Sequence, residues 1–318
     1  MRSVQPLRGA ALLALSALLF SLMGVFVREA SASVGNEVIV FFRNLVGVLF
    51  FLPLVLVRGF QPLKTARPLT HLKRTGYGLG AMYCFFYAIA HLPLADAMLF
   101  TYSAPVFTPV LAWFWLKEPL TKRMLVLSLV GLIGVLLVSK PSGALFSSMS
   151  LVGLAASLLA ASAFVSIREM SDSEPSFRIV FYFAFFSACF SALPLGWAWQ
   201  PLDSHQLLLL FGAGFFAAVA QFAMSRAYSL APPGLIGPVA YSAIIFSGLI
   251  AWILWNETPG PSSWAGAALI FTASFLSVTH KKSLRKHACF CFNGGHVLFN
   301  SHLHLWERAC PRRRLNPF

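Results

Sequence analysis

The feature that most constrains this chain is a long internal repeat. Residues 88–119 recur, after a shift of 139 positions, as residues 227–258. The identical pairs are Ala88/Ala227, Pro93/Pro232, Tyr102/Tyr241, Ser103/Ser242, Ala104/Ala243, Phe107/Phe246, Ala112/Ala251, Trp113/Trp252 and Glu118/Glu257. Earlier parts of the halves match at a shift of 140, pairing Leu18-Leu19 with Leu158-Leu159, Arg28-Glu29 with Arg168-Glu169 and Ile39-Val40-Phe41 with Ile179-Val180-Phe181. We therefore interpret the chain as one unit that occurs twice.

Composition places this duplicated unit in a membrane. Hydrophobic residues make up 58% of the chain and charged residues 11%, whereas a soluble domain carries about 25% charged residues. Its apolar segments approach the ~20 residues with which a helix crosses ~30 Å of hydrocarbon. The predicted spans are 9–27, 38–57, 75–92, 96–116, 123–139, 150–168, 177–198, 206–229, 235–255 and 262–279. We expect an all-α polytopic membrane protein with ten transmembrane helices, since helices satisfy their own backbone hydrogen bonds in lipid.

The first apolar segment admits a second interpretation as a secretory signal. Ala30-Ser31-Ala32 resembles a signal-peptidase site. However, Arg28-Glu29 separates it from an apolar stretch that is long for the core of a signal peptide. We interpret the segment as the first span.

The distribution of lysine and arginine predicts the orientation. If the N-terminus is cytoplasmic, the inside segments hold Arg2, Arg8, Arg58, Lys64, Arg67, Lys73, Arg74, Lys117, Lys122, Arg123, Arg168, Arg178 and a basic C-terminal tail. The outside loops then hold only Arg28 and Lys140, which is the positive-inside pattern of a protein with both termini in the cytoplasm. A five-helix unit is odd-numbered, so its second copy enters from the opposite side, and we expect two inverted five-helix repeats with a substrate site near the midplane. The net charge of +14 then reflects the anionic inner leaflet, and we expect no nucleic-acid partner.

The repeated motifs resemble those of EamA-type carriers in the drug/metabolite transporter superfamily. Each half has an Ala-x-x-x-x-Pro turn, a Tyr-Ser helix and a Trp…Glu ending; the first copy ends in Glu118-Pro119, and the second reads Glu257-Thr258-Pro259. The resemblance implies an EamA-type repeat over 8–139 and another over 150–280. It also implies a carrier that moves a small organic metabolite, such as an amino acid, by alternating access. We expect an exporter in a bacterial inner membrane; the alternatives are an endomembrane nucleotide-sugar exchanger and a membrane scaffold that transports nothing.

Arg43 is the sharpest candidate for substrate binding. A central arginine costs about 2.5–3.5 kcal/mol on insertion scales, and no nearby residue in sequence neutralises it. With Asn44 it would front the cavity and attract a carboxylate or phosphate; alternatively, Arg43 reaches the outer membrane surface by snorkelling. The other candidate cavity residues, each of which could instead serve helix packing, are Tyr83, Tyr87, Tyr102, Ser103, Gln221, Tyr241 and Ser242.

Two helix-end carboxylates are candidate gates. Glu118 and Glu257 end equivalent helices, and so would lie on opposite faces of the membrane. The alternative is that they are solvated or pair with local partners such as Lys117 or Lys122. No spanning segment holds an Asp or Glu near its middle, so we expect facilitated diffusion or substrate exchange rather than obligatory proton coupling.

Other motifs indicate neither an enzyme nor a cofactor. The run Gly76-x-Gly78-x-Gly80 follows no strand and has the wrong spacing for a nucleotide loop, so we assign it to close helix packing. The tail, 281–318, is basic, and we expect it to be cytoplasmic and poorly ordered; its His and Cys spacing fits no standard zinc module. The expected partners are a small-molecule substrate and the lipid bilayer. The oligomeric state stays open between monomer and dimer.

Overall fold

The computed structural model describes residues 5–59, 63–91, 100, 102–139, 148–256 and 258–279. The chain divides into a unit of Met1–Thr279 and a unit of His280–Phe318, and the described residues all belong to the first. The predicted tail 281–318, Asp96 and Glu257 lie outside the described residues.

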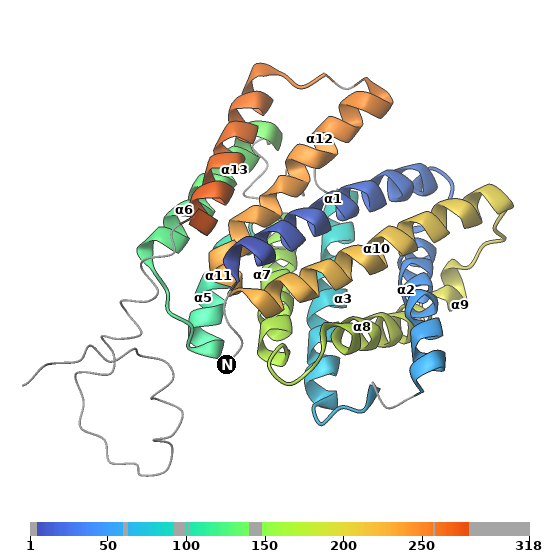
Figure 1. Ribbon diagram of the computed structural model, residues 1–318. Helices are drawn as coiled ribbons and strands as arrows, with labels where there is room; N and C mark the ends of the chain where they lie inside the picture. The colour runs from blue at the N-terminus through green and yellow to red at the C-terminus, as the bar shows by residue number, and fades with distance from the viewer. Residues whose placement is uncertain are drawn as a thin grey trace, which may run out of the picture. The chain divides into compact units, whose positions relative to one another are not determined.

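The described chain is entirely helical (Figure 1). Its elements are α1 (Pro6–Ser31), α2 (Asn36–Arg58), α3 (Pro68–His91), α5 (Ala104–Leu116), α6 (Lys122–Ser139), α7 (Ser148–Met170), α8 (Ser176–Ser191), α9 (Leu195–Ala198), α10 (Ser204–Leu230), α11 (Pro233–Ile236), the 3-10 helix η3 (Gly237–Tyr241), α12 (Ser242–Trp255) and α13 (Pro261–Thr279). In this part of the chain seven helical spans are long and apolar enough to cross a membrane, and α5 and α8 are shorter apolar helices. The protein is therefore an integral, multi-pass membrane protein.

Prolines explain where the helices depart from the predicted spans. The segment predicted over 177–198 ends as a helix at Ser191, and Pro194 is the N-cap of the short α9. A proline cannot donate the backbone hydrogen bond that would continue α8. The segment predicted over 235–255 is interrupted by η3, which contains Pro238. The first predicted span is therefore irregular at its C-terminal end, and the second at its N-terminal end.

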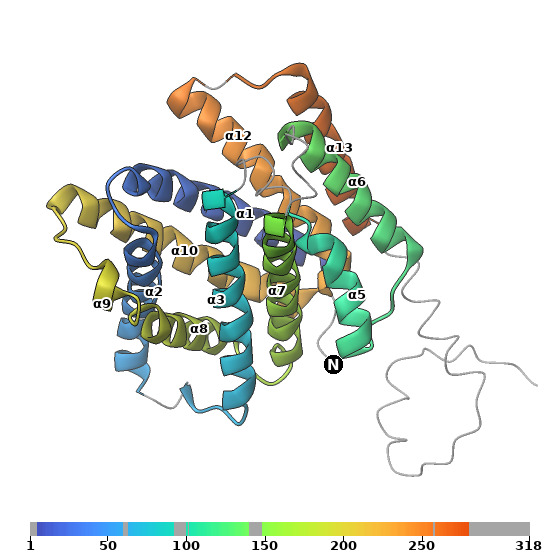
Figure 2. The ribbon, with the colours of Figure 1, turned by 180° about the vertical axis from the view of Figure 1, so that it is seen from behind.

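Equivalent helices of the two halves make equivalent contacts. Helix α1 packs on α10 and α12, and its counterpart α7 packs on α3 and α5. Helix α2 contacts its own counterpart α8, and α6 contacts its counterpart α13 (Figures 1 and 2). Exchanging the halves therefore leaves this set of neighbours unchanged.

The ends of α5 and α12 show the same correspondence at atomic detail. Lys117 and Asn256 are related by the 139-residue shift, and both adopt the left-handed conformation with φ of 56° and 54°. Each closes its helix by donating its backbone N–H, to Ala112 O and to Ala251 O respectively. These are the only positive-φ residues other than glycine among those the structure describes.

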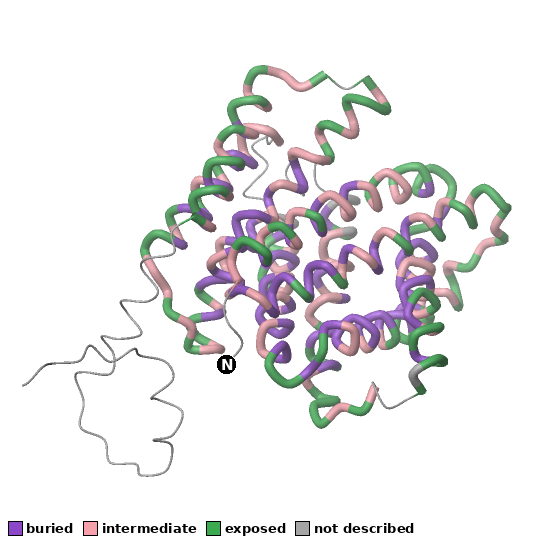
Figure 3. The backbone as a smooth tube through the Cα atoms, viewed as in Figure 1, coloured by how far each residue is buried: buried purple, intermediate pink, exposed green. Residues whose placement is uncertain are grey.

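Burial follows the helix contacts. The largest buried cluster, which includes Leu13, Ile167, Tyr228 and Ile236, lies where α1, α7, α10 and α11 meet. Figure 3 shows buried positions concentrated there and along α8, while α13 alternates buried and exposed positions. Helix α13 buries one stripe, at Gly266, Ile270, Ala273 and Ser277. Large apolar side chains on the outer faces are suited to contact lipid.

Candidate functional site

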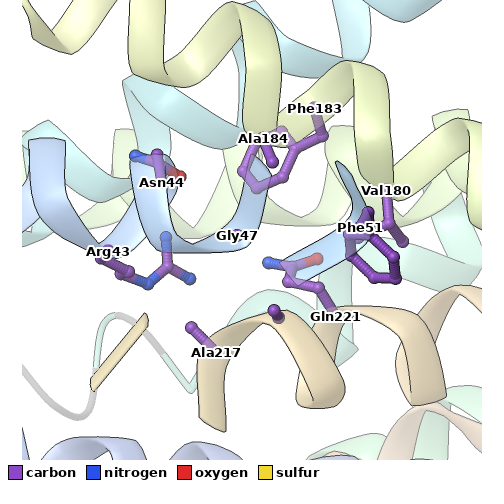
Figure 4. Close-up of a pocket in the computed structure, with 10 residues that line it drawn as sticks. Arg43, Asn44, Gly47, Phe51, Val180, Phe183, Ala184, Ala217 and Gln221 are labelled. Atoms are coloured by element: carbon purple, nitrogen blue, oxygen red, sulfur yellow. The ribbon is translucent and has the colours of Figure 1, made fainter. Parts of the chain in front are cut away.

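A small pocket lies between α2, α8 and α10, where helices of the two halves meet. Its lining residues are Arg43, Asn44, Gly47 and Phe51 from α2, Val180, Phe183 and Ala184 from α8, and Ala217, Ala218 and Gln221 from α10. Figure 4 shows Arg43 and Gln221 extending toward each other from opposite walls. The free volume is about 10 Å³, close to the minimum for one water molecule. In this conformation the pocket is too small to hold a metabolite.

Arg43 carries its charge into the interior without a carboxylate partner. Its Nε lies 3.4 Å from Met23 Sδ on α1, and its Nη1 lies 3.4 Å from Met82 Sδ on α3. Thioether sulfur is only a weak acceptor. Within the described part of the chain no Asp or Glu oxygen lies within 4.0 Å of this guanidinium. The site therefore holds a partly buried cation that its surroundings do not neutralise.

The depth of this guanidinium bears on the snorkelling alternative. Met23 lies eight residues before Ser31 at the end of α1, and Met82 lies nine before His91 at the end of α3. At 1.5 Å per residue, Met23 is about 12 Å and Met82 about 14 Å inside its helix end. Arg43 is thus directed toward neighbouring helices here and does not extend to a helix end.

Arg74 is a second buried cation, which sequence reasoning missed. It was assigned to a cytoplasmic loop, and that assignment is wrong, because α3 begins at Pro68 and Arg74 is only 3% exposed. Its Nη2 donates to Gln221 Oε1 at 3.2 Å, and its Cζ lies 4.0 Å from the centre of the Phe183 ring. Both contacts are with pocket residues. Its Nε and Nη1 are buried and have no hydrogen-bond partner among the described residues.

Gly78 makes this placement of Arg74 possible. A Cβ at Gly78 would collide with Arg74 Nη1 and would lie 2.8 Å from Phe183 Cε2. The guanidinium therefore occupies the space that a side chain at residue 78 would fill. Gly78 also allows the close approach of Phe183 from α8, as the packing prediction requires, and a Cβ at Gly80 would meet Leu159 of α7 at 3.4 Å. A Cβ at Gly76 would meet nothing within 4 Å, so the packing prediction is wrong for Gly76.

Three of the predicted binding residues, Arg43, Asn44 and Gln221, come together in the pocket. Asn44 is buried and its Nδ2 donates to Val40 O at 2.8 Å, within α2. This bond leaves the second amide proton and the amide oxygen as polar groups of the wall.

The predicted tyrosines and serines lie elsewhere and mostly serve packing. Tyr241 is fully buried, its hydroxyl donates to Ser128 O at 2.9 Å, and Tyr102 packs against the same cluster. Tyr83 lies in α3 with a buried hydroxyl that has no partner among the described residues, and Tyr87 is 48% exposed. Ser103 and Ser242 donate to backbone carbonyls three residues earlier, at Phe100 and Val239. None of these six lines the pocket.

The predicted gate residue Glu118 pairs with a residue that is distant in sequence. Its Oε1 accepts a hydrogen bond from Arg168 Nε at 2.9 Å, and Arg168 Nη1 donates to Tyr228 O at 3.3 Å. The alternative of a local Lys117 or Lys122 partner is therefore replaced by a contact between the two halves.

The symmetry-related helix end also contains an arginine. Arg28 is the counterpart of Arg168, and its Cζ lies 4.0 Å from the centre of the Trp255 ring at the end of α12. Trp255 Nε1 donates to Glu29 Oε1 at 3.3 Å. The second predicted gate residue, Glu257, lies outside the described residues.

A second polar cluster lies at the turn between α7 and α8. Glu174 is 4% exposed; its carboxylate pairs with Arg178 and accepts from Thr65 Oγ1 at 2.5 Å. His71 Nε2 lies 3.9 Å from the same carboxylate. This cluster ties the segment before α3 to the start of α8. No group of three or more metal-ligating residues occurs among the residues described here.

A multi-pass helical protein with a pocket between its two halves has the architecture of a membrane carrier. The chain belongs to the EamA-like transporter family, which matches residues 7–140 and again residues 147–279.

Individual relatives support this assignment. A pseudopaline exporter of Pseudomonas aeruginosa is 33% identical over 279 residues, covering 86% of this chain and 97% of that protein. An S-adenosylmethionine uptake transporter of Rickettsia bellii is 27% identical over 249 residues, covering 78% of this chain and 86% of that protein. A riboflavin transporter of Vibrio cholerae is 25% identical over 287 residues, covering 88% of this chain and 96% of that protein. The chain is thus a transporter and not an enzyme.

The fold has a counterpart among solved structures. One crystal structure matches with a TM-score of 0.74 and 19% identity, covering 88% of this chain and 98% of its own. At this identity the match shows the fold alone.

Proposed function

We propose that this chain is a carrier that moves a small organic metabolite bearing an anionic group across a bacterial inner membrane by alternating access. The substrate binds in the pocket between α2, α8 and α10. The observation that carries the proposal is Arg43, a cation directed into this pocket whose contacts are two methionine sulfurs. A charge kept in lipid without a partner is costly, and such residues mark substrate pathways.

The proposed architecture is ten transmembrane helices in two inverted five-helix repeats, with both termini cytoplasmic. The equivalent contacts of the two halves support a pseudo-two-fold arrangement, and the pocket lies where α2 meets its counterpart α8. Binding at the repeat interface is the arrangement by which such carriers alternate access. Reporter fusions after Lys64 should report the cytoplasm and fusions near Asp203 the outside; a fusion near Asp203 that reports the cytoplasm would contradict the inverted arrangement.

The contracted pocket supports alternating access rather than an open channel. The pocket has free space for about one water molecule, so a metabolite does not fit in it in this conformation. Transport therefore requires the walls to move apart and close again.

For direction we propose export. The support is the likeness to the pseudopaline exporter of Pseudomonas aeruginosa, over 97% of that protein's length. Transport in inside-out vesicles compared with right-side-out vesicles tests this choice: net movement only into right-side-out vesicles would reverse it.

The substrate class is tested by a flux screen in proteoliposomes. Amino acids, organic anions, nucleotide sugars and cationic drugs are offered to wild-type protein, to Arg43→Ala and to protein-free liposomes. We expect saturable flux of an organic anion by the wild-type protein only. Nucleotide sugars belong in the screen because Arg74 adds a second buried cation. Flux of cationic drugs that persists in Arg43→Ala would contradict the proposal, and no flux for any class would favour a scaffold.

A further inference from the structure

We propose that the pocket takes a substrate with two negative charges, held jointly by Arg43 and Arg74. The chemical class is a small dianionic metabolite, either a dicarboxylate or a phosphate monoester. This inference rests on the proposed function and specifies the substrate of the same pocket.

The two guanidinium groups approach the pocket from different helices of the first half. Arg43 lines the pocket from α2. Arg74 comes from α3 and lies directly behind the lining, in contact with two lining residues, Gln221 and Phe183. Both cations contact Gln221 or the wall that holds it: Arg43 lines the same pocket as Gln221, and Arg74 donates to Gln221 Oε1 at 3.2 Å. Two like charges held together in a desolvated site are unfavourable unless an anion lies between or beside them.

Each guanidinium keeps donors that the protein does not use. A guanidinium has five N–H donors. Arg74 gives one nitrogen to Gln221, while its buried Nε and Nη1 lack any partner among the described residues. Arg43 has only sulfur contacts. Unmade hydrogen bonds of buried charged groups are expensive, so these donors indicate a ligand rich in acceptor oxygens.

The carboxylates that the structure describes are engaged elsewhere or lie at helix ends. Glu29 contacts Trp255, Glu118 pairs with Arg168, Glu174 pairs with Arg178, and Asp203 caps the start of α10. No salt bridge within the described ranges reaches Arg43 or Arg74. The counter-charge for this pair is therefore expected from outside the protein.

Gln221 adds a neutral donor between the two cations. Its Oε1 accepts from Arg74, which orients the amide so that Nε2 remains to donate into the pocket, on the side facing Arg43 (Figure 4). The Arg43 guanidinium and the Gln221 amide line this space, and the Arg74 guanidinium lies one contact behind Gln221. Such an arrangement suits two carboxylates or the three oxygens of a phosphate.

The repeat gives Arg43 a different counterpart on the opposite wall. A shift of 140 residues relates Arg43 to Phe183, and the Phe183 ring lies against Arg74. Among the described residues at this pocket, both cations come from the first half, and the second half contributes the Phe183 ring that Arg74 packs against. This asymmetry fits a pocket that binds its ligand in one orientation.

The test measures anion-dependent thermal stabilisation of purified protein. The probes are succinate, its matched monoanion butyrate, and glycerol 3-phosphate, at equal ionic strength. For wild-type protein we expect the half-saturating concentration of at least one dianion to be at least about tenfold lower than that of butyrate, since one additional charged contact contributes about a factor of ten. Succinate and glycerol 3-phosphate distinguish a dicarboxylate site from a phosphate site.

Substitutions in α3 test whether Arg74 binds a ligand or only packs against its neighbours. Arg74→Gln should abolish the preference for the dianion while the protein remains folded, because it removes a charge and keeps an amide. Gly78→Ala should do the same by displacing the guanidinium, whereas Gly76→Ala, whose added Cβ meets nothing within 4 Å, should behave as wild type.

Failure of the two-charge site can be distinguished from failure of the carrier proposal. Wild-type protein that no dianion stabilises, or that butyrate stabilises equally, would overturn the two-charge site. So would a preference that survives in both Arg74→Gln and Gly78→Ala. If flux of a monoanion is abolished in Arg43→Ala but unchanged in Arg74→Gln, the carrier proposal stands and the dianionic one fails.

Discussion

Glu118 and Arg168 join the two halves of the chain at one end of the helix bundle. The carboxylate follows the last turn of α5, the guanidinium lies in the last turn of α7, and Nε and Oε1 are 2.9 Å apart. Because Arg168 also donates to Tyr228 O near the end of α10, one side chain links α5, α7 and α10. This contact must break or move if that end of the bundle opens.

We predict that Glu118→Gln makes the pocket more accessible. Both side chains are about a fifth exposed (18% and 19%), so we assign the pair about 1 kcal/mol, which corresponds to about a fivefold change in an opening equilibrium. The measurement is the rate at which a thiol reagent labels Ala217→Cys in a background without native cysteines. Asp172→Asn, which removes an exposed carboxylate near the same end, is the control, and equal rates in the two variants would contradict a gating role.

A pair of glycines tests the packing of Tyr241 against α6. A Cβ at Gly131 would collide with the Tyr241 ring, while a Cβ at Gly248 would meet nothing within 4 Å. Gly131→Ala should therefore destabilise the protein by about 1–3 kcal/mol through overpacking. Gly248→Ala should be neutral or stabilising by up to about 1 kcal/mol, because alanine favours the helix. Thermal unfolding in detergent measures both, and a stable Gly131→Ala would show that Tyr241 is not held as described.

Transport should not require a proton gradient. Among the described residues the most buried carboxylate is Glu174, and its pairing with Arg178 and Thr65 at the turn between α7 and α8 favours a structural role. Flux in proteoliposomes with and without an imposed pH gradient, at zero membrane potential, tests this prediction of exchange or facilitated diffusion. Uphill accumulation that needs the gradient and disappears in Glu174→Gln or Glu118→Gln would contradict it.

The sequence predicts the helices better than their side-chain contacts. The predicted spans 123–139 and 262–279 differ by one residue from α6 and α13, because long apolar runs bounded by polar residues determine such helices. Equivalent helices of the two halves have equivalent neighbours. Their contact residues are therefore under similar constraints, which makes the repeat visible in the sequence.

Arg74 and Tyr241 show where sequence reasoning fails. Arg74 follows several charged or polar residues at a helix start, so its position resembles a cytoplasmic loop; only the approach of α8 and α10 buries it. Tyr241 is identical to its counterpart Tyr102, but its hydroxyl is bonded to the backbone of α6. Identity between repeats does not distinguish a packing residue from a cavity residue. The glycine that accommodates Arg74 could be found only from coordinates.

The central claim, that Arg43 binds an anionic substrate in the pocket between the halves, is tested most directly by counterflow in proteoliposomes. Wild-type protein, Arg43→Lys and Arg43→Ala are compared after their amounts and orientation in the liposomes are matched. We predict loss of counterflow of at least about tenfold in Arg43→Ala, and partial recovery in Arg43→Lys, because lysine restores the charge but not the bidentate geometry. Full counterflow in Arg43→Ala would contradict the account and return Arg43 to the role of a snorkelling side chain.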